Sequence, residues 1–264
     1  MQHILWNADP VLLSIGPLQL RWYGLLFVSS FFLGLWLMQW IFKREGKDPS
    51  ILDNLLIYLI IGAVVGSRLM HCLAYEPDFY LSHPLEILKI WKGGLASHGG
   101  LLGSIAAVYL FSKRYHIDLI WLLSRTAIAG TITASFVRIG NFFNSEILGL
   151  PSDKPWAIIF ERVDMVPRHP VQLYEALSYF LLFLLMLTIY KRIKPEFATR
   201  ILPGIFLTVM FTVRFLLEYT KTRQADYTTS LPFTTGQMLS IPFIILGIGW
   251  IIWAIKTKNT NKKI

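Results

Sequence analysis

The chain has 264 residues, of which 54% are hydrophobic and 14% aromatic, and its mean hydropathy is +0.52. This composition is far more apolar than that of a typical soluble domain and indicates an integral membrane protein. The net charge of +9 at pH 7 could indicate nucleic-acid binding, but the distribution of the basic residues argues against a nucleic-acid partner.

Seven apolar segments are long enough, or nearly so, to cross a bilayer as helices. In chain order they are residues 18–42, 51–74, 95–111, 119–137, 172–190, 201–219 and 237–255. The third is the weakest, because glycines at and before its start loosen a helix there. The pattern predicts an all-α integral membrane protein with about seven transmembrane helices, in which residues 1–264 form a single polytopic membrane domain. Residues 138–171, which hold four prolines, are expected to form a small extracytoplasmic cap.

The basic residues set the expected orientation. If the N-terminus lies outside, the cytoplasmic segments hold 13 Lys and Arg in 34 residues, and the opposite side holds 8 in 88 residues. The cytoplasmic segments are then 43–50, 112–118, 191–200 and 256–264. By the positive-inside rule, the N-terminus is expected outside and the C-terminus in the cytoplasm. Residues 1–17 lack a basic start, so the first span is expected to insert as an uncleaved anchor.

In this orientation, polar side chains from five spans share one depth, near the outer leaflet. They are Tyr23; His98; Arg138, Asn141, Asn144 and Glu146; Gln172, Tyr174 and Glu175; and Arg214 with Glu218. Polar groups at membrane depth are costly and are kept mainly for binding or chemistry. An arginine with amide donors nearby suits an oxyanion, above all a phosphate, so the candidate ligand is a phospholipid head group.

These residues also have structural explanations. Arg214 and Glu218, four apart on a helix, could form a neutralising ion pair, and Arg138 could extend to the interface. His98, flanked by glycines, could be an interfacial histidine or a general base, and Tyr23 fits an aromatic belt. Arg68 and Arg125 lie near span ends or packing faces and are assigned no role.

Several mechanisms find no support in the sequence. No HExxH zinc motif, GxSxG elbow or Walker loop is present, and the lone Cys72 lies in an apolar stretch typical of a small core residue. The remaining groups are cationic and amide-rich, which suits the stabilisation of an anionic leaving group. If the protein is an enzyme, the nucleophile is therefore expected to come from a substrate.

Nearly end to end, the chain resembles the prolipoprotein diacylglyceryl transferases. The resemblance rests on Arg21-Trp-Tyr-Gly24, on the stretch from Gly93-Gly94 to His98-Gly-Gly100, on Arg138-Ile-Gly-Asn-Phe-Phe-Asn-Ser-Glu-Ile-Leu-Gly149, on Arg168-His-Pro-Val-Gln-Leu-Tyr-Glu175, and on Arg214 with Glu218. It implies transfer of the diacylglyceryl group of phosphatidylglycerol to the lipobox cysteine of a preprolipoprotein. A thioether forms and glycerol phosphate leaves, which is the first step of bacterial lipoprotein maturation.

The resemblance also implies the partners and the location. The partners are phosphatidylglycerol, preprolipoprotein signal peptides with a lipobox cysteine, and membrane lipids, with no nucleic acid and no metal or organic cofactor. The location is the bacterial inner membrane, with the active site toward the outer leaflet.

As implied roles, Arg138 and Arg214 hold the phosphate and stabilise its developing charge. His98 is the first candidate to take the thiol proton, and Tyr23 and a lipid oxygen are the alternatives. The implied substrate-binding residues are Tyr23, Asn141, Asn144, Glu146, Gly149 and Glu218. The chain departs from the family at two positions. Met210 stands where many members carry a tyrosine, and either Lys221 or Arg223 replaces an arginine that follows Glu218.

Two other functions use the same arginines. A carrier or flippase would move an anionic lipid, but transporters often show repeated halves and a site near the midplane. No repeat is visible here, and the polar groups crowd one leaflet, which favours the enzyme. A lipid-binding assembly protein without turnover is the second alternative, and consumption of the lipid would separate it from the enzyme.

Overall fold

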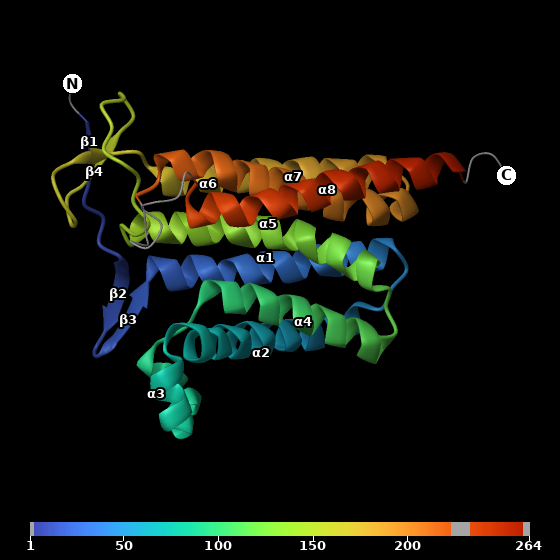
Figure 1. Ribbon diagram of the computed structural model, residues 1–264, viewed down its shortest axis with the longest axis horizontal. Helices are drawn as coiled ribbons and strands as arrows, with labels where there is room; N and C mark the ends of the chain where they lie inside the picture. The colour runs from blue at the N-terminus through green and yellow to red at the C-terminus, as the bar shows by residue number, and fades with distance from the viewer. Residues whose placement is uncertain (1–2, 223–232, 261–264) are drawn as a thin grey trace. The chain divides into compact units, whose positions relative to one another are not determined.

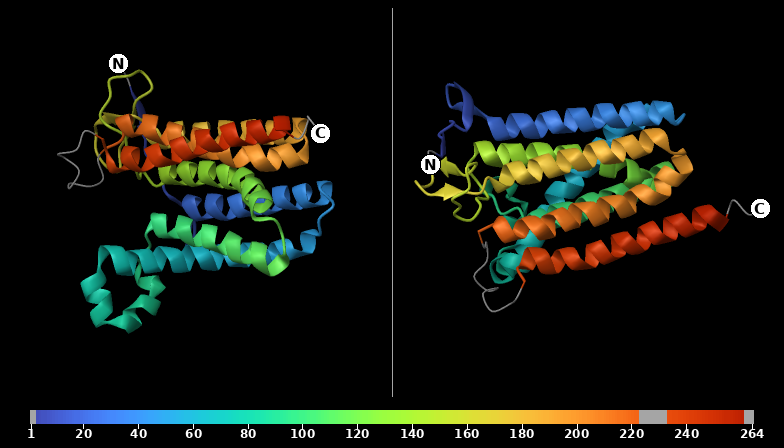
Figure 2. Two further views of the ribbon diagram at one scale, coloured as in Figure 1. Left: turned by 45° about the vertical axis from the view of Figure 1, so that its right-hand side comes forward. Right: turned by 90° about the horizontal axis from the view of Figure 1, so that it is seen from above.

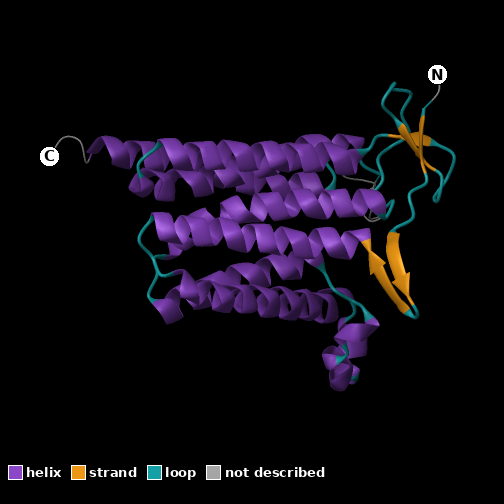
Figure 3. Ribbon diagram, turned by 180° about the vertical axis from the view of Figure 1, so that it is seen from behind, coloured by secondary structure: helices purple, strands orange, loops and turns teal. Residues whose placement is uncertain are grey.

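The computed structural model describes residues 3–222 and 233–260, and most of them are helical (Figure 3). The chain divides into two compact units, Met1–Leu37 with Ser124–Ile264, and Met38–Leu123, and each is described by itself. Two long helices, α1 (Trp22–Arg44) and α5 (Leu119–Phe143), contribute residues to both units. That the whole chain acts as one membrane domain stays a prediction.

The first unit contains three further long helices, α6 (Val171–Arg192), α7 (Pro195–Leu217) and α8 (Thr235–Thr260), and the short 3-10 helix η5 (Glu218–Thr220). Helix α7 packs against both α6 and α8 (Figure 1). Small residues let α7 and α8 approach closely, because a Cβ atom on Gly247 would lie only 2.5 Å from Thr208 Oγ1. Such contacts are typical of helix pairs in membranes.

A small sheet lies at one end of these helices. Strands β1 (Ile4–Trp6), β4 (Ile158–Phe160) and β5 (Pro167–Arg168) pair in the order β1-β4-β5, with β1 parallel to β4. Phe142, at the end of α5, packs with Ile158 and Phe160 in a buried cluster. A separate hairpin joins β2 (Val11–Ile15) to β3 (Leu18–Arg21). None of these strands was expected from the sequence, since each has only two to five residues.

The second unit is built on two helices that run side by side, α2 (Leu52–Met70) and α4 (Ser97–Tyr115) (Figures 1 and 2). A 3-10 turn, η1 (Pro49–Ile51), precedes α2, and a π-helical turn, η2 (His71–Tyr75), follows it. Between η2 and α4 the chain forms α3 (Pro77–Ser82), η3 (Pro84–Leu88) and η4 (Ile90–Lys92), which lie beyond the end of α2. This set of short helical turns is called the arm below.

Glycines form the contact between α2 and α4. A Cβ atom on Gly66 would lie 2.3 Å from the carbonyl oxygen of Gly99, and one on Gly103 would lie 1.9 Å from that of Gly62. The two backbones therefore touch, as in pairs of membrane helices with small residues four apart.

In the part of the chain that the structure describes, six helices are long and apolar enough to cross a membrane. They are Trp22–Arg44, Pro49–Tyr75, Leu119–Phe143, Val171–Arg192, Pro195–Thr220 and Gly236–Thr257. The third expected span, 95–111, does form a helix, α4, but α4 is not among the six, so the expected seven spans are not confirmed. Polar residues at both ends of α4, namely Ser97, His98, Lys113 and Arg114, lower its hydropathy. Residues 18–21, expected in the first span, form β3 instead.

The glycine contact gives a testable prediction. Gly66→Ala is expected to destabilise the protein by about 1–3 kcal/mol, because the new methyl group overlaps a carbonyl oxygen of the neighbouring backbone. Gly130→Ala, in α5, is the matched control, since a Cβ atom there meets nothing within 4 Å. Thermal unfolding in detergent measures both variants. Equal melting temperatures for the two would show that the α2–α4 contact tolerates a side chain.

Candidate active site

The last turn of α5 and the turn that follows it hold four of the predicted residues together. Arg138 Nη1 donates to Asn141 Oδ1 at 3.2 Å, and Asn141 Nδ2 donates to Glu146 Oε2 at 3.0 Å. Asn144 Nδ2 donates to the other oxygen of Glu146, Oε1, at 3.1 Å. Both asparagine amides therefore point their donors at one carboxylate, and one of them also accepts from the arginine.

The backbone of this turn is unusual. Helix α5 ends in a Schellman motif, because Glu146 N–H bonds to the Asn141 carbonyl and Ser145 N–H bonds to that of Phe142. Ser145 has φ 54° and Ile147 has φ 55°, so two non-glycine residues adopt the left-handed conformation. For a β-branched residue such as isoleucine that conformation is strained, and such strain gathers at functional sites. The turn brings the Glu146 carboxylate back toward α5, where it accepts from Asn141.

Gln172, at the start of α6, fixes the same turn from the other side. Its side chain is fully buried, and its Nε2 donates to the backbone carbonyl of Glu146. Gly149 lies close by without room for a side chain, since a Cβ atom there would lie 2.3 Å from the carbonyl oxygen of His169. Gly149 also forms an isolated β-bridge with Lys221. The structure thus places Gly149 at a backbone crossing beside the turn.

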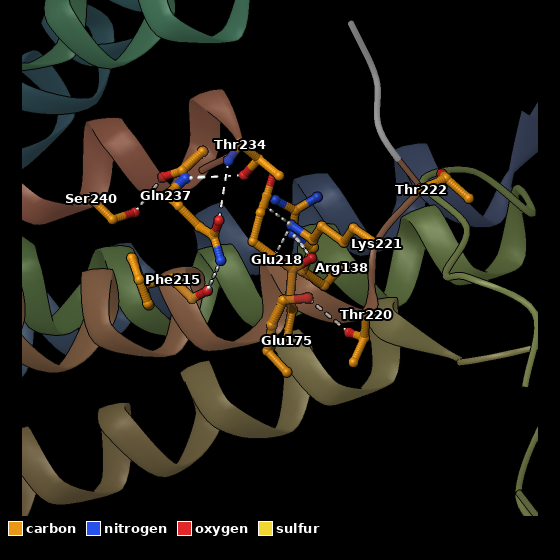
Figure 4. Close-up of polar contacts among 12 residues, drawn as sticks. Arg138, Glu175, Phe215, Glu218, Thr220, Lys221, Thr222, Thr234, Gln237 and Ser240 are labelled. Carbon is orange, nitrogen blue, oxygen red and sulfur yellow. Dashed lines mark hydrogen bonds and ion pairs between the residues drawn. The ribbon is translucent and has the colours of Figure 1, made fainter. Parts of the chain in front are cut away.

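Glu175, in α6, is the centre of an ion-pair network (Figure 4). Its side chain is fully buried, and its Oε2 lies 2.9 Å from Arg138 Nε, an ion pair whose geometry is not that of a hydrogen bond. Its Oε1 accepts from Lys221 Nζ at 2.7 Å and from the Tyr179 hydroxyl at 3.3 Å. A carboxylate removed from water requires such partners, since an unpaired buried charge is very costly.

Glu218, in η5, joins this network through Lys221 rather than through Arg214. Its Oε2 lies 3.8 Å from Lys221 Nζ, and its carboxylate is packed against Gly236 at the start of α8. Within residues 3–222 and 233–260, Arg214 forms no ion pair with Glu218, although the sequence suggested one. Arg214 interacts electrostatically with the Tyr179 hydroxyl, as Arg138 and Glu175 do.

Tyr23 also lies beside this cluster. Its ring is packed against Gly140 of α5, where an added Cβ atom would lie 2.7 Å from Tyr23 Cδ2. Its hydroxyl interacts electrostatically with Glu146 and Arg138. The structure therefore brings together eight of the nine predicted site residues, namely Tyr23, Arg138, Asn141, Asn144, Glu146, Gly149, Arg214 and Glu218.

The ninth, His98, belongs to the other unit. It stands in the first turn of α4, but its side chain lies outside the described residues. Arg223 lies outside them too, so only Lys221 of the two candidate replacements has described contacts. Met210 is half-buried in α7, one helical turn before Arg214.

Four residues of this network were not predicted as site residues: Gln172, Glu175, Tyr179 and Lys221. The available signal was the glutamate itself, because a carboxylate four residues inside an apolar helix requires a buried cation. In the segment between α5 and α6, the Arg168 guanidinium bonds to Asp164 and holds the pKa of that carboxyl below its usual value. In the described part of the chain, no group of three His, Cys, Asp or Glu side chains could hold a metal ion.

Comparison with known proteins shows the family of the chain. The family model described as prolipoprotein diacylglyceryl transferase matches residues 10–253. The phosphatidylglycerol–prolipoprotein diacylglyceryl transferase of Tolumonas auensis is 49% identical over 97% of this chain and 99% of its own length. That of Chloroherpeton thalassium is 48% identical over 98% and 97%, and that of Bacteroides fragilis 39% over 97% of each chain. The chain therefore belongs to the prolipoprotein diacylglyceryl transferase family of enzymes.

Proposed function

We propose that the protein transfers the diacylglyceryl group of phosphatidylglycerol to the lipobox cysteine of a preprolipoprotein. Membership of the family supports this activity, and so does the described cluster. The single observation that carries it is the gathering of Arg138, Arg214 and Lys221 at one end of the helices. A phosphate-bearing lipid is the substrate that such a group of cations suits.

In the proposed reaction the cysteine sulfur attacks the carbon of the diacylglyceryl group that is bonded to the phosphate oxygen. A sulfur–carbon bond forms as the carbon–oxygen bond breaks, and the electron pair of that bond goes to the phosphate oxygen. Arg138 and Arg214 stabilise the charge that builds up on the leaving glycerol phosphate. Their interaction with the phosphate is stronger in the transition state than in the ground state. His98 accepts the thiol proton, since an imidazole exchanges protons near neutral pH.

The remaining residues orient the substrate in this proposal. Asn141 and Asn144 face the head group, and Glu146 holds both amides in place. Tyr23 lines the same region from α1, next to Gly140. Glu218 acts through Lys221, which it contacts, and Gly149 keeps the backbone crossing beside the turn compact.

The proposed topology has seven spans, with α4 as the third to enter the membrane. The N-terminus lies outside, the C-terminus lies in the cytoplasm, and residues 138–171 form a cap over the outer leaflet of the bacterial inner membrane. Two features support this: the bias of Lys and Arg toward one side, and the position of the cluster. The cluster joins the end of α5, the start of α6 and the end of α7, which are neighbouring ends in an antiparallel set of helices.

The test is an assay with purified protein, phosphatidylglycerol and a lipobox peptide. We expect a peptide mass gain of one diacylglyceryl group and an equal release of glycerol phosphate. A peptide with serine in place of cysteine should gain no mass. Lipid that is bound but never consumed, with folded protein, would instead favour the carrier or the binding protein.

The same assay tests the proton acceptor. His98→Gln is expected to lower turnover at every pH, because glutamine keeps hydrogen bonding but takes up no proton. Normal turnover of this variant across the pH range would remove His98 from the mechanism without removing the transfer activity.

A further inference from the structure

Arg68, near the end of α2, is a buried cation for which the sequence suggested no role. Only 3% of the residue is exposed. Its guanidinium donates to five backbone carbonyls of the arm and of the link that follows it. These are Ile87 at 2.9 Å, Glu86 at 2.6 Å, Lys89 at 3.4 Å, Gly93 at 2.6 Å and Gly94 at 3.2 Å.

The charge of Arg68 has no carboxylate beside it in the described residues. Its guanidinium carbon lies 5.0 Å from the centre of the Tyr80 ring, a cation–π contact that also comes from the arm. A buried cation in an apolar span is costly, and an apolar side chain would fill the same space at lower cost. The planar guanidinium, with its several donors, is therefore kept to hold the backbone of the arm and of the link that follows it in place.

What it holds is the entry to α4. Gly93 and Gly94 both have positive φ, 87° and 76°, and a Cβ atom on Gly94 would lie 2.5 Å from the His71 ring and 2.7 Å from Arg68 Nη1. Two residues later, Ala96 N–H bonds to the carbonyl of Ser67 at 3.0 Å. The chain from residue 93 to residue 96 is thus tied at three points to Ser67 and Arg68.

The first turn of α4 is pressed onto the same part of α2. A Cβ atom on Gly99 would lie 2.2 Å from the carbonyl oxygen of Gly66, and one on Gly100 would lie 2.6 Å from Ser67 Oγ. His98 stands directly before these two glycines. Its backbone position is therefore set by contacts with α2 on one side and by the Arg68-bound link on the other.

We propose that Arg68 is a positioning residue for the transfer reaction, which fixes the Gly93–Gly94 link and thereby the first turn of α4, where His98 stands. This inference rests on the proposed function. Arg68 touches no substrate in it, because all of its described contacts are with the arm and the link.

Arg68→Lys tests the proposal, since lysine keeps the charge but cannot bond to five carbonyls spread around a planar group. The turnover number kcat is expected to fall about 10- to 100-fold, the cost of a displaced catalytic group. The KM for phosphatidylglycerol should stay within about twofold, because the cations that bind the phosphate are not touched. Gly94→Ala, which disturbs the same link and leaves the charge, should give the same pattern.

Arg125→Lys is the matched control. Arg125 is also fully buried, its guanidinium carbon lies 5.0 Å from the centre of the Tyr190 ring, and its Nη2 donates to the Pro195 carbonyl at 3.3 Å. Arg125 belongs to the first unit, whereas the entry of α4 belongs to the second. Both lysine variants should lose thermal stability, but only Arg68→Lys should lose kcat per folded molecule. Equal kcat in the two would overturn the proposal.

A double-mutant cycle with His98→Gln completes the test. If Arg68 acts through His98, kcat of the double variant should be no lower than kcat of His98→Gln alone. A loss of kcat equal to the product of the two single losses would show that Arg68 does not act through His98. Full activity of His98→Gln would remove only the proposed base. The comparison of Arg68→Lys with Arg125→Lys would then still decide whether Arg68 positions α4 for the reaction.

Discussion

Arg138→Lys is expected to lower the rate of diacylglyceryl transfer by about 10²- to 10³-fold, the usual cost of losing one donor to a developing oxyanion. Arg138 already uses Nε for Glu175 and Nη1 for Asn141. The planar guanidinium has further donors for a phosphate while these contacts are kept, whereas one ammonium group cannot satisfy all three. Initial rates of peptide modification, measured at saturating lipid, give the loss.

The fold should survive this change, because lysine keeps the positive charge next to the buried Glu175. Arg162→Lys is the control on the same side of the protein, since the Arg162 side chain is 42% exposed and its polar contacts in the described residues are with Ala8 and Asp9. It should transfer at the normal rate. If Arg138→Lys also transfers at the normal rate, Arg138 serves the ion-pair network alone and the phosphate must be held elsewhere.

The residues that the sequence predicted well are close together along the chain. Arg138, Asn141, Asn144 and Glu146 span nine positions at the end of one helix, so the helix and its terminal turn are enough to bring them together. The long apolar helices were predictable for a similar reason, since bilayer thickness fixes their length. The exception is α4, which is not among the apolar spans because its ends are polar, with His98 at one end and Lys113 and Arg114 at the other.

What the sequence could not provide are partners far apart along the chain. Lys221 meets Glu175 across 46 residues, and β1 pairs with β4 across more than 150. A spacing of four suggested that Arg214 pairs with Glu218, but in the described chain Lys221 lies closer to that glutamate. Periodicity predicts which residues share a helix face and says nothing about which other helix meets it.

Glu175→Gln is expected to have the largest effect on stability, about 3–5 kcal/mol, because removing one partner of a buried ion pair leaves the others uncompensated. Glu175 is fully buried, and two cations, Arg138 and Lys221, share its carboxylate. Glutamine has nearly the same shape, so the loss reports the charge rather than the packing. Chemical unfolding in detergent micelles, followed by circular dichroism, measures it. Tyr179→Phe is the control, since it removes only the 3.3 Å hydroxyl contact to the same carboxylate.

A compensating change separates the stability of this network from its part in catalysis. Lys221→Met removes one of the two cations that share the Glu175 carboxylate. Glu175→Gln with Lys221→Met leaves Arg138 without its glutamate and Glu218 without its lysine, so we expect it to recover part of the lost stability. Activity should not return, because Arg138 loses the carboxylate that orients it and the site loses a cation near the phosphate. If activity returned together with stability, Glu175 would only balance charge. A stable but inactive double variant would instead show that the Glu175–Lys221 pair serves catalysis as well as stability.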